Sequence, residues 1–367
     1  MEARWTPMRW PDTWKDPSLL DLLKGTAVDS LLIGPGEELG PVRVRAQNEG
    51  YQLTAPSGVT VIKGEWPGVK MARGRDAAGP TGVPWVNSNG WAVRLAMALQ
   101  PQTTVWVDAP PEAGTFIIPD SYLIAIADSA AYGGRWIVSL DAALASSLAA
   151  AKADADKPWK RILQTASFFA ARKPWSEYRT VANIGVVSDF SGANEFFSHE
   201  LLNLLARAGA HARAVPPGGS FAGLRAILYP DAAPPSAALR SRIDAFVKAG
   251  GLLMTSEKRP LDDPYLWAND AVVMVSHRYD LVRFWNSGAT GSFVATSPQG
   301  GKTLVHLLFY SMRGPDSATV RIAGRFRNVK AATVEQPAVT NLQSLPQDGG
   351  IEVHLPQVSQ YVALELE

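Results

Sequence analysis

Short apolar runs alternate with helical stretches along the first half of the chain. Four runs read as buried strands, because they are rich in β-branched and aromatic residues and lie near glycine or proline. They cover residues 28–34, 59–66, 103–108 and 135–140. Repeated strand–helix units of this kind predict a parallel sheet of the (β/α) barrel type. A complete eight-fold barrel needs about 200 residues or more, so residues 1–176 predict a truncated or degenerate barrel.

The pattern changes twice after this unit. Between residues 180 and 256, apolar strands alternate with helices at 193–208 and 236–249, which predicts a compact doubly wound domain of the flavodoxin type. From residue 290 onward, apolar positions alternate with period two between turns that contain glycine or proline, which predicts a small β-sandwich. The fold class is therefore α/β, with domains expected at 1–176, 177–288 and 289–367.

Three of the predicted strands deliver a carboxylate at or just beyond their C-terminal ends. These residues are Glu65, Asp108 and Asp141. Because the C-terminal ends of parallel barrel strands meet at one face, we expect the three side chains to share a site. Glycoside hydrolysis needs two carboxyl groups, one to protonate the leaving oxygen and one to attack or to activate water. Glu65 is the leading acid/base candidate, with Asp108 or Asp141 as the second carboxylate.

For each carboxylate, a purely structural role is the alternative to a catalytic one. Asp141 is placed to cap the helix that follows it, and Asp108 is placed to order a turn. Glu65 has basic neighbours with which it can pair, at Lys63, Lys70 and Arg73. The sequence leaves these alternatives open.

Aromatic and amide side chains surround the three acids in the sequence. The chain has 12 Trp, and many lie beside Pro, Gly or Asp rather than on core periodicities. Exposed Trp rings in loops are suited to stacking on sugar faces, although ordinary core packing is the alternative for each of them. The residues expected to bind substrate are Trp66, Trp85, Asn87, Asn89, Trp91, Trp106, Arg135 and Trp136.

Composition excludes several other functions. The formal net charge of +1 gives no electrostatic case for nucleic acid or an anionic membrane. The chain has no cysteine, which excludes disulfides, thiolate metal sites and cysteine nucleophiles. Its five His are scattered without metal-ligand spacing, so no metal or organic cofactor is expected. The N-terminus lacks the apolar run of a signal peptide, and we expect either a cytoplasmic or a mature exported form.

Two segments of the second half carry a family resemblance. Ile184-Gly-Val-Val-Ser-Asp and Phe246-Val-Lys-Ala-Gly-Gly-Leu-Leu-Met-Thr resemble the class I glutamine amidotransferase-like domain, in the form that serves for trimerisation in family 42 β-galactosidases. The tail segments at 303–311 and 351–356 resemble the C-terminal β domain of such glycosidases. The nucleophile of glutamine hydrolysis would be a cysteine after residue 229, where this chain reads Pro230-Asp231, so that activity is excluded.

The resemblance implies a glycoside hydrolase-like protein that acts on oligosaccharide. The family's Asn-Glu pair at a strand end is missing here, because Asn48-Glu49 and Asn194-Glu195 lie in predicted helices, so its catalytic residues are not carried over. A non-catalytic carbohydrate-binding or assembly protein with a degenerate barrel is the alternative. An incomplete barrel exposes sheet edges, so we expect a homo-oligomer, a dimer or trimer, formed through residues 180–260.

Overall fold

Five parallel strand segments form the N-terminal unit of the computed structural model, which describes residues 6–69, 86–276, 278–285, 287–311, 317–338, 340–356 and 358–367. Their bounds are β1 (Pro7–Arg9), β2 (Ser30–Leu32), β3 (Val59–Lys63), β6 (Thr104–Asp108) and the pair β7 (Arg135–Trp136) and β8 (Val138–Ser139). The pair is one strand bent at Ile137, whose N–H donates to the carbonyl of Val107 at 3.0 Å. The order is therefore β2-β1-β8 continuing into β7-β6-β3.

This strand order is that of an incomplete barrel, in which some of the strands that would close the sheet are missing from the described residues. The last strand of the unit pairs with the first, as the last and first strands do in a closed barrel. Within the part of the chain that the structure describes, no strand joins β3 to β2, and the barrel stays open there. The expected degenerate barrel is thus confirmed. Two further strands, β4 (Gly68–Val69) and β5 (Val86–Asn87), pair with each other in antiparallel orientation.

Helices of the N-terminal unit follow its strands. They are η1 (Pro17–Leu23), η2 (Glu37–Leu39), α1 (Gly40–Asn48), α2 (Gly90–Leu99), α3 (Pro119–Ala131), α4 (Ala142–Ala149), α5 (Ala153–Ala170) and η3 (Lys173–Glu177). Helix α3 is buried on nearly all sides, because it contacts β7 on one side and the β-sandwich strand β16 (Thr303–Phe309) on another. Its apolar sequence, Leu123-Ile-Ala-Ile-Ala127, follows from this central position.

The middle unit is a four-stranded parallel sheet in the order β11-β10-β12-β13, the flavodoxin-like order that the sequence predicts. Successive residues of β10 point to opposite faces: Ile184 and Val186 pack under α6 and α8, and Val187 packs under α7. The elements are β10 (Ile184–Val187), η4 (Gly192–Asn194), α6 (Glu195–Arg207), β11 (Ala212–Val215), β12 (Ala226–Tyr229), α7 (Ala237–Lys248), β13 (Leu252–Thr255) and α8 (Pro264–Val275).

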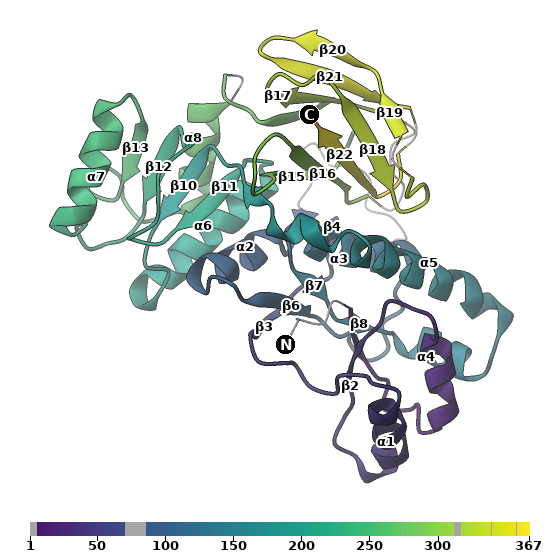
Figure 1. The fold of residues 1–367 in the computed structure, drawn as a ribbon. Coiled ribbons are helices and arrows are strands. Elements are labelled where there is room, and N and C mark those ends of the chain that lie inside the picture. The colour runs from purple at the N-terminus through teal and green to yellow at the C-terminus, as the bar shows by residue number, and fades with distance from the viewer. Residues whose placement is uncertain are drawn as a thin grey trace.

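The C-terminal unit is the expected β-sandwich of two antiparallel sheets, drawn in yellow-green in Figure 1. One sheet has the order β14-β17-β21-β20, and the other has the order β19-β18-β22-β16-β15-β9. The bounds are β9 (Arg179–Thr180), β14 (Val282–Trp285), β15 (Thr290–Thr296), β16 (Thr303–Phe309), β17 (Ala318–Ala323), β18 (Val329–Thr333), β19 (Thr340–Leu342), β20 (Ser344–Gln347), β21 (Gly350–Leu355) and β22 (Tyr361–Leu366). Strands β9 and β14 come from outside the range expected for this unit.

The six-stranded sheet of the sandwich is a shared layer. Tyr361 and Ala363 of β22 belong to the core of the N-terminal unit, whereas Val362, Leu364 and Leu366 belong to the core of the sandwich. Helices α3 and α5 lie against this sheet, between the sandwich and the barrel-like strands (Figure 1). The first and last parts of the chain therefore form one continuous apolar body.

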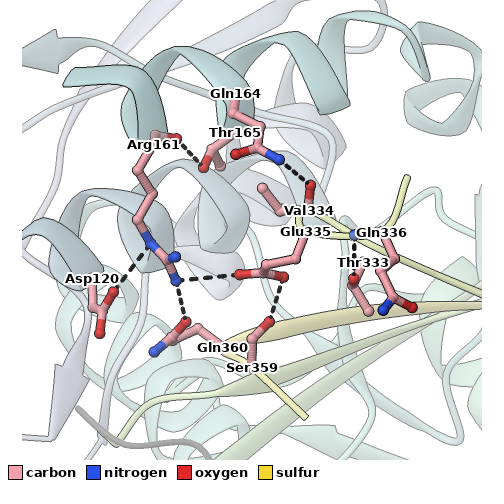
Figure 2. A network of polar contacts seen from close by, with 10 residues as sticks. All are labelled: Asp120, Arg161, Gln164, Thr165, Thr333, Val334, Glu335, Gln336, Ser359 and Gln360. Carbon is pink, nitrogen blue, oxygen red and sulfur yellow. Dashed lines mark hydrogen bonds and ion pairs between the residues drawn. The ribbon is translucent and has the colours of Figure 1, made fainter. Parts of the chain in front are cut away.

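A polar network completes this junction at its rim. The Arg161 guanidinium of α5 contacts Asp120 at 3.1 Å, Glu335 at 3.2 Å and Gln360 at 3.0 Å, as Figure 2 shows. Gln164, one turn further along α5, donates to the carbonyl of Val334 at 2.9 Å. The ion-paired side chains, Arg161, Asp120 and Glu335, are partly exposed, so each ion pair contributes at most about 1 kcal/mol. The network orients α5 on the sandwich more than it stabilises the junction.

Candidate active site at the strand ends

The largest hollow at the strand ends lies where β3 and β6 finish. These strands pair in parallel from Val59 opposite Thr104 to Lys63 opposite Asp108, so their C-terminal ends reach the same edge. The hollow has a volume of about 800 Å³ and is lined by residues 61–66 of one strand end and 108–112 of the other, with Thr115 and Ile117. Its walls are largely apolar, and its polar groups include Glu65, Asp108 and Glu112.

Glu65 is exposed at this hollow, and its backbone is held on both sides by one amide. The Glu65 N–H donates to Asn89 Oδ1 at 2.9 Å, and Asn89 Nδ2 donates to the Glu65 carbonyl at 2.9 Å. Gly64 makes this arrangement possible, because a Cβ at that position would lie 2.3 Å from Cγ1 of Val107. The loop after β3 therefore lies tightly against β6 and presents Glu65 from a fixed backbone.

Asp108 is half-buried at the end of β6 and pairs with Arg9 of β1. One Arg9 nitrogen, Nη2, lies 2.8 Å from Oδ1 and 2.7 Å from Oδ2 of the carboxylate. Arg9 also lines a second hollow of about 340 Å³, at the ends of β1, β2 and β8. The two hollows share Pro110 and Pro111. We refer to these two neighbouring hollows together as the groove; Arg9 lines one of them and Asp108 lines the other.

Asp141 has a different environment from the other two predicted acids. It is 1% exposed and caps α4, where its Oδ1 accepts from the N–H groups of Ala143 and Leu144. Its Oδ2 accepts from the Tyr122 hydroxyl at 3.0 Å, and that hydroxyl accepts from the Asp141 N–H at 2.8 Å. Asp141 does not line the hollow that Glu65 and Asp108 share. The cap that the sequence leaves as an alternative is present.

Of the four predicted Trp residues within the described ranges, Trp66 alone lines the large hollow. Its half-buried ring packs edge-on against Trp136 and Tyr122, with centroid distances of 5.0 and 5.2 Å. Trp136 and Trp106 are core residues at 2% and 0% exposure, so stacking on a ligand by these two rings lacks support. Trp91 packs toward the middle unit, 6.0 Å from the His199 ring. Trp85 lies outside the described residues.

The three polar residues that were expected to bind substrate lie in different environments. Asn89 is buried and supports the backbone of Glu65 rather than facing the hollow. Asn87 accepts a hydrogen bond from Arg207 of the middle unit at 3.3 Å. Arg135 is buried and donates to the carbonyl of Gly134, and burial holds the pKa of its guanidinium well below its usual value. These three residues therefore surround the site without lining the large hollow.

Arg9 and Glu112 are among the polar groove residues that sequence reasoning missed. Glu112 is a third carboxyl group on the large hollow, four residues beyond the end of β6. Arg9 was missed because residues 1–16 read as an irregular segment rich in Trp and Pro, yet residues 7–9 form β1. Glu112 follows the Pro110-Pro111 pair, whose position after a strand is the signal that would have located it. Within the described ranges, no group of three His, Asp or Glu side chains is placed to hold a metal.

Asp128 of α3 is a buried carboxylate behind the site. It is fully buried, and it accepts from the Asn89 N–H at 2.8 Å, from Asn89 Nδ2 at 3.2 Å and from the Tyr310 hydroxyl at 2.6 Å. Burial raises the pKa of Asp128 to about 6, although these hydrogen bonds oppose the shift. The apolar helix sequence around Asp128 gave no signal for this role.

Comparisons with known proteins identify the fold. No protein-family model and no curated protein sequence matches the chain. α-L-Fucosidase isoenzyme 2 from Paenibacillus thiaminolyticus matches with a TM-score of 0.50 and 10% identity, over 72% of this chain and 60% of its own. A rhamnosidase from Novosphingobium sp. PP1Y matches with a TM-score of 0.51 and 9% identity, over 93% of this chain and 37% of its own.

A family 42 β-galactosidase is also among the solved structures that match this chain. A catalytic mutant of Gan42B from G. stearothermophilus matches with a TM-score of 0.45 and 9% identity, over 90% of this chain and 65% of its own. The chain thus spans less than two thirds of the length of these neighbours. The fold resembles that of glycoside hydrolases, as the sequence resemblance implied. At about 10% identity, this likeness concerns the fold and transfers no catalytic residue.

Proposed function

We propose that the chain is a glycoside hydrolase-like protein that acts on oligosaccharide, with Glu65 and Asp108 as its carboxylate pair. The observation that carries the proposal is their common position on one open hollow of about 800 Å³ with a Trp66 wall. A carboxyl group beside apolar surface is the arrangement in which glycosidases place a proton donor. The second hollow beyond Arg9 extends the groove, which suits a ligand of more than one sugar unit.

The two carboxyl groups differ in a way that suggests separate roles. Asp108 lies 2.7 Å from Nη2 of Arg9 and is the proposed group that attacks or activates water. Glu65 is exposed next to Trp66 and is the proposed proton donor. Asp141 is not proposed as the second carboxylate, because its oxygens are occupied by the helix N-terminus and by Tyr122.

Turnover of a panel of aryl glycosides and reducing-end release from oligosaccharides test this proposal. Glu65→Gln keeps the size of the side chain and removes the acid, so we expect kcat to fall at least ~100-fold, within the range that one acid/base group supplies. Glu112→Gln is the matched control, because Glu112 lines the same hollow without lying at a strand end. Wild-type turnover that is unchanged in Glu65→Gln would reject the assignment.

A non-catalytic carbohydrate-binding protein is the second candidate. The Arg9–Asp108 ion pair favours it, since an acid held by a base is less available for catalysis. Calorimetric binding of an oligosaccharide without release of any product would select this candidate. Both candidates use the same groove, so loss of binding on Trp66→Ala is expected for each of them.

We also propose that the chain forms a homo-oligomer through residues 180–260. Phe196 of α6 is 75% exposed there, and Val247 and Leu252 are also exposed. Exposed apolar side chains of this size favour association. Light scattering is expected to give a molar mass of a dimer or trimer that falls in Phe196→Ser. The mass of one chain across a wide concentration range would contradict this proposal. No helix within the described ranges is long and apolar enough to cross a membrane.

A further inference from the structure

A chain of hydrogen bonds leads from the β-sandwich to the backbone of Glu65. It begins at Tyr310, just after β16, whose hydroxyl donates to Asp128 Oδ1 at 2.6 Å. Asp128 of α3 accepts through Oδ2 from the N–H and the side-chain amide of Asn89. Asn89 in turn holds both the N–H and the carbonyl of Glu65. Three regions separated in the sequence thus converge on the loop that presents the candidate acid.

Burial makes each link of this chain costly to break. Tyr310, Asp128 and Asn89 are 3%, 0% and 4% exposed, so water does not replace a lost partner. Asn89 uses Oδ1 for Glu65 and Nδ2 for both Glu65 and Asp128, which fixes the orientation of its amide. A shift of Tyr310 would leave Asp128 without one of its donors. It would also loosen Asn89, which holds both backbone groups of Glu65.

A second contact shows that the same loop lies against the sandwich. Gly68, three residues beyond Glu65, has a φ of +140°. A Cβ built at Gly68 would lie 3.5 Å from the carbonyl oxygen of Tyr310. The segment after β3 therefore meets the end of β16 directly, as well as through Asp128 and Asn89.

We infer that the β-sandwich sets the position of Glu65 in the groove through Tyr310, Asp128 and Asn89, which act as positioning residues. The consequence for turnover rests on the proposed function of Glu65, whereas the mechanical link does not. An acid must be held within a fraction of an ångström of its productive position. The sandwich is thus part of the site, although its residues do not line the large hollow.

Hydrogen–deuterium exchange of the Glu65 amide in the full chain tests the link. Tyr310→Phe removes one oxygen and keeps the ring, and we expect the Glu65 amide to exchange about tenfold faster, as for loss of one buried hydrogen bond. Tyr361→Phe is the matched control, since its equally buried hydroxyl contacts the His306 ring at 2.6 Å and lies outside this chain of contacts. Unchanged exchange of the Glu65 amide in folded Tyr310→Phe would overturn the inference.

A second pair of variants serves if Tyr310→Phe does not fold. In Asp128→Asn, the side-chain oxygen can still accept from Asn89 and its NH₂ can donate to the Tyr310 oxygen, so wild-type exchange at Glu65 is expected. Asp128→Ala removes both acceptors, and faster exchange is expected. Equal exchange in Asp128→Asn, Asp128→Ala and the wild type would overturn the inference.

Kinetics separate this inference from the proposed function. If Glu65 is the acid, Tyr310→Phe should lower kcat on an aryl glycoside about tenfold and change KM less than about twofold, because a displaced acid affects the transition state more than binding. The Asp128→Asn variant, which can keep these hydrogen bonds, should retain most of the wild-type kcat. Faster Glu65 exchange together with full activity of Glu65→Gln would reject the proposed function and leave the positioning link in place.

Discussion

Two pairs of acids in this molecule have opposite environments. Glu65 and Asp108 lie on an open hollow, and the hydrogen bonds that hold the Glu65 loop in place end on its backbone. Asp128 and Asp141 lie in the layer beneath and are at most 1% exposed. Each of the buried acids accepts three hydrogen bonds through its carboxylate oxygens.

The difference shows what makes a carboxylate available for chemistry. Asp108 ends β6 and Asp141 lies two residues beyond β8, so strand-end position alone does not distinguish them. The oxygens of the buried pair accept hydrogen bonds from a helix N-terminus, from Asn89 and from two Tyr hydroxyls. The open pair keeps carboxylate oxygens at the surface of a groove. Buried acids are therefore expected to control stability, and open acids are expected to control activity.

The largest effect on stability is expected for Asp141→Ala. The change removes the cap of α4, which costs about 1–2 kcal/mol, and leaves the buried Tyr122 hydroxyl without its acceptor, which costs about 2 kcal/mol more. We expect urea denaturation to show a free energy of unfolding lower by about 3–4 kcal/mol. Asp154→Ala, in the first turn of α5 at an exposed position, is the matched control and should change stability by less than about 1 kcal/mol.

A small loss of stability in Asp141→Ala would contradict the idea that the buried acids control stability. If the free energy of unfolding fell no more than in Asp154→Ala, the buried hydrogen bonds of Asp141 would not stabilise the fold. If a stably folded Asp141→Ala variant lost all glycosidase turnover, Asp141 would be needed for activity rather than only for stability.

Local sequence patterns predicted the strands well and the site only partly. The run at 103–108 matches β6, whose central residues are buried, and the run at 59–66 contains β3, which ends at Lys63 and is only partly buried. Strand β1 could not be read from Pro7-Met-Arg9, since its conformation depends on pairing with both β2 and β8. The missing strand also concealed Arg9 as the partner of Asp108.

The roles of the Trp and Asn residues depend on contacts distant in sequence. Trp106 lies between Val105 and Val107 on a strand whose two faces are both buried, so period-two alternation gave no sign of its exposure. Asn89 contacts Glu65 and Asp128, which are 24 and 39 positions away. No local signal marks such a residue. Asn89 is the N-cap residue of α2, yet its side chain makes no capping hydrogen bond there.

The pH dependence of stability gives the smaller test of the buried pair. Burial raises the pKa of Asp128 from 3.8 to about 6 in the folded protein, so the folded state holds a proton that the unfolded state has released between these values. The stability that this proton supplies is fully present below about pH 4 and is lost as the pH rises through about 6. Two pKa units correspond to about 3 kcal/mol.

Asp128→Asn removes this titration and keeps the hydrogen-bonding geometry. We therefore expect the free energy of unfolding of the variant, relative to the wild type, to increase by up to about 3 kcal/mol between pH 4 and pH 7. Urea denaturation of both proteins at several pH values measures this difference, in which the titrations of all other groups cancel. A difference that stays constant across this range would mean that Asp128 is ionised throughout. The Tyr310 and Asn89 donors would then outweigh its burial.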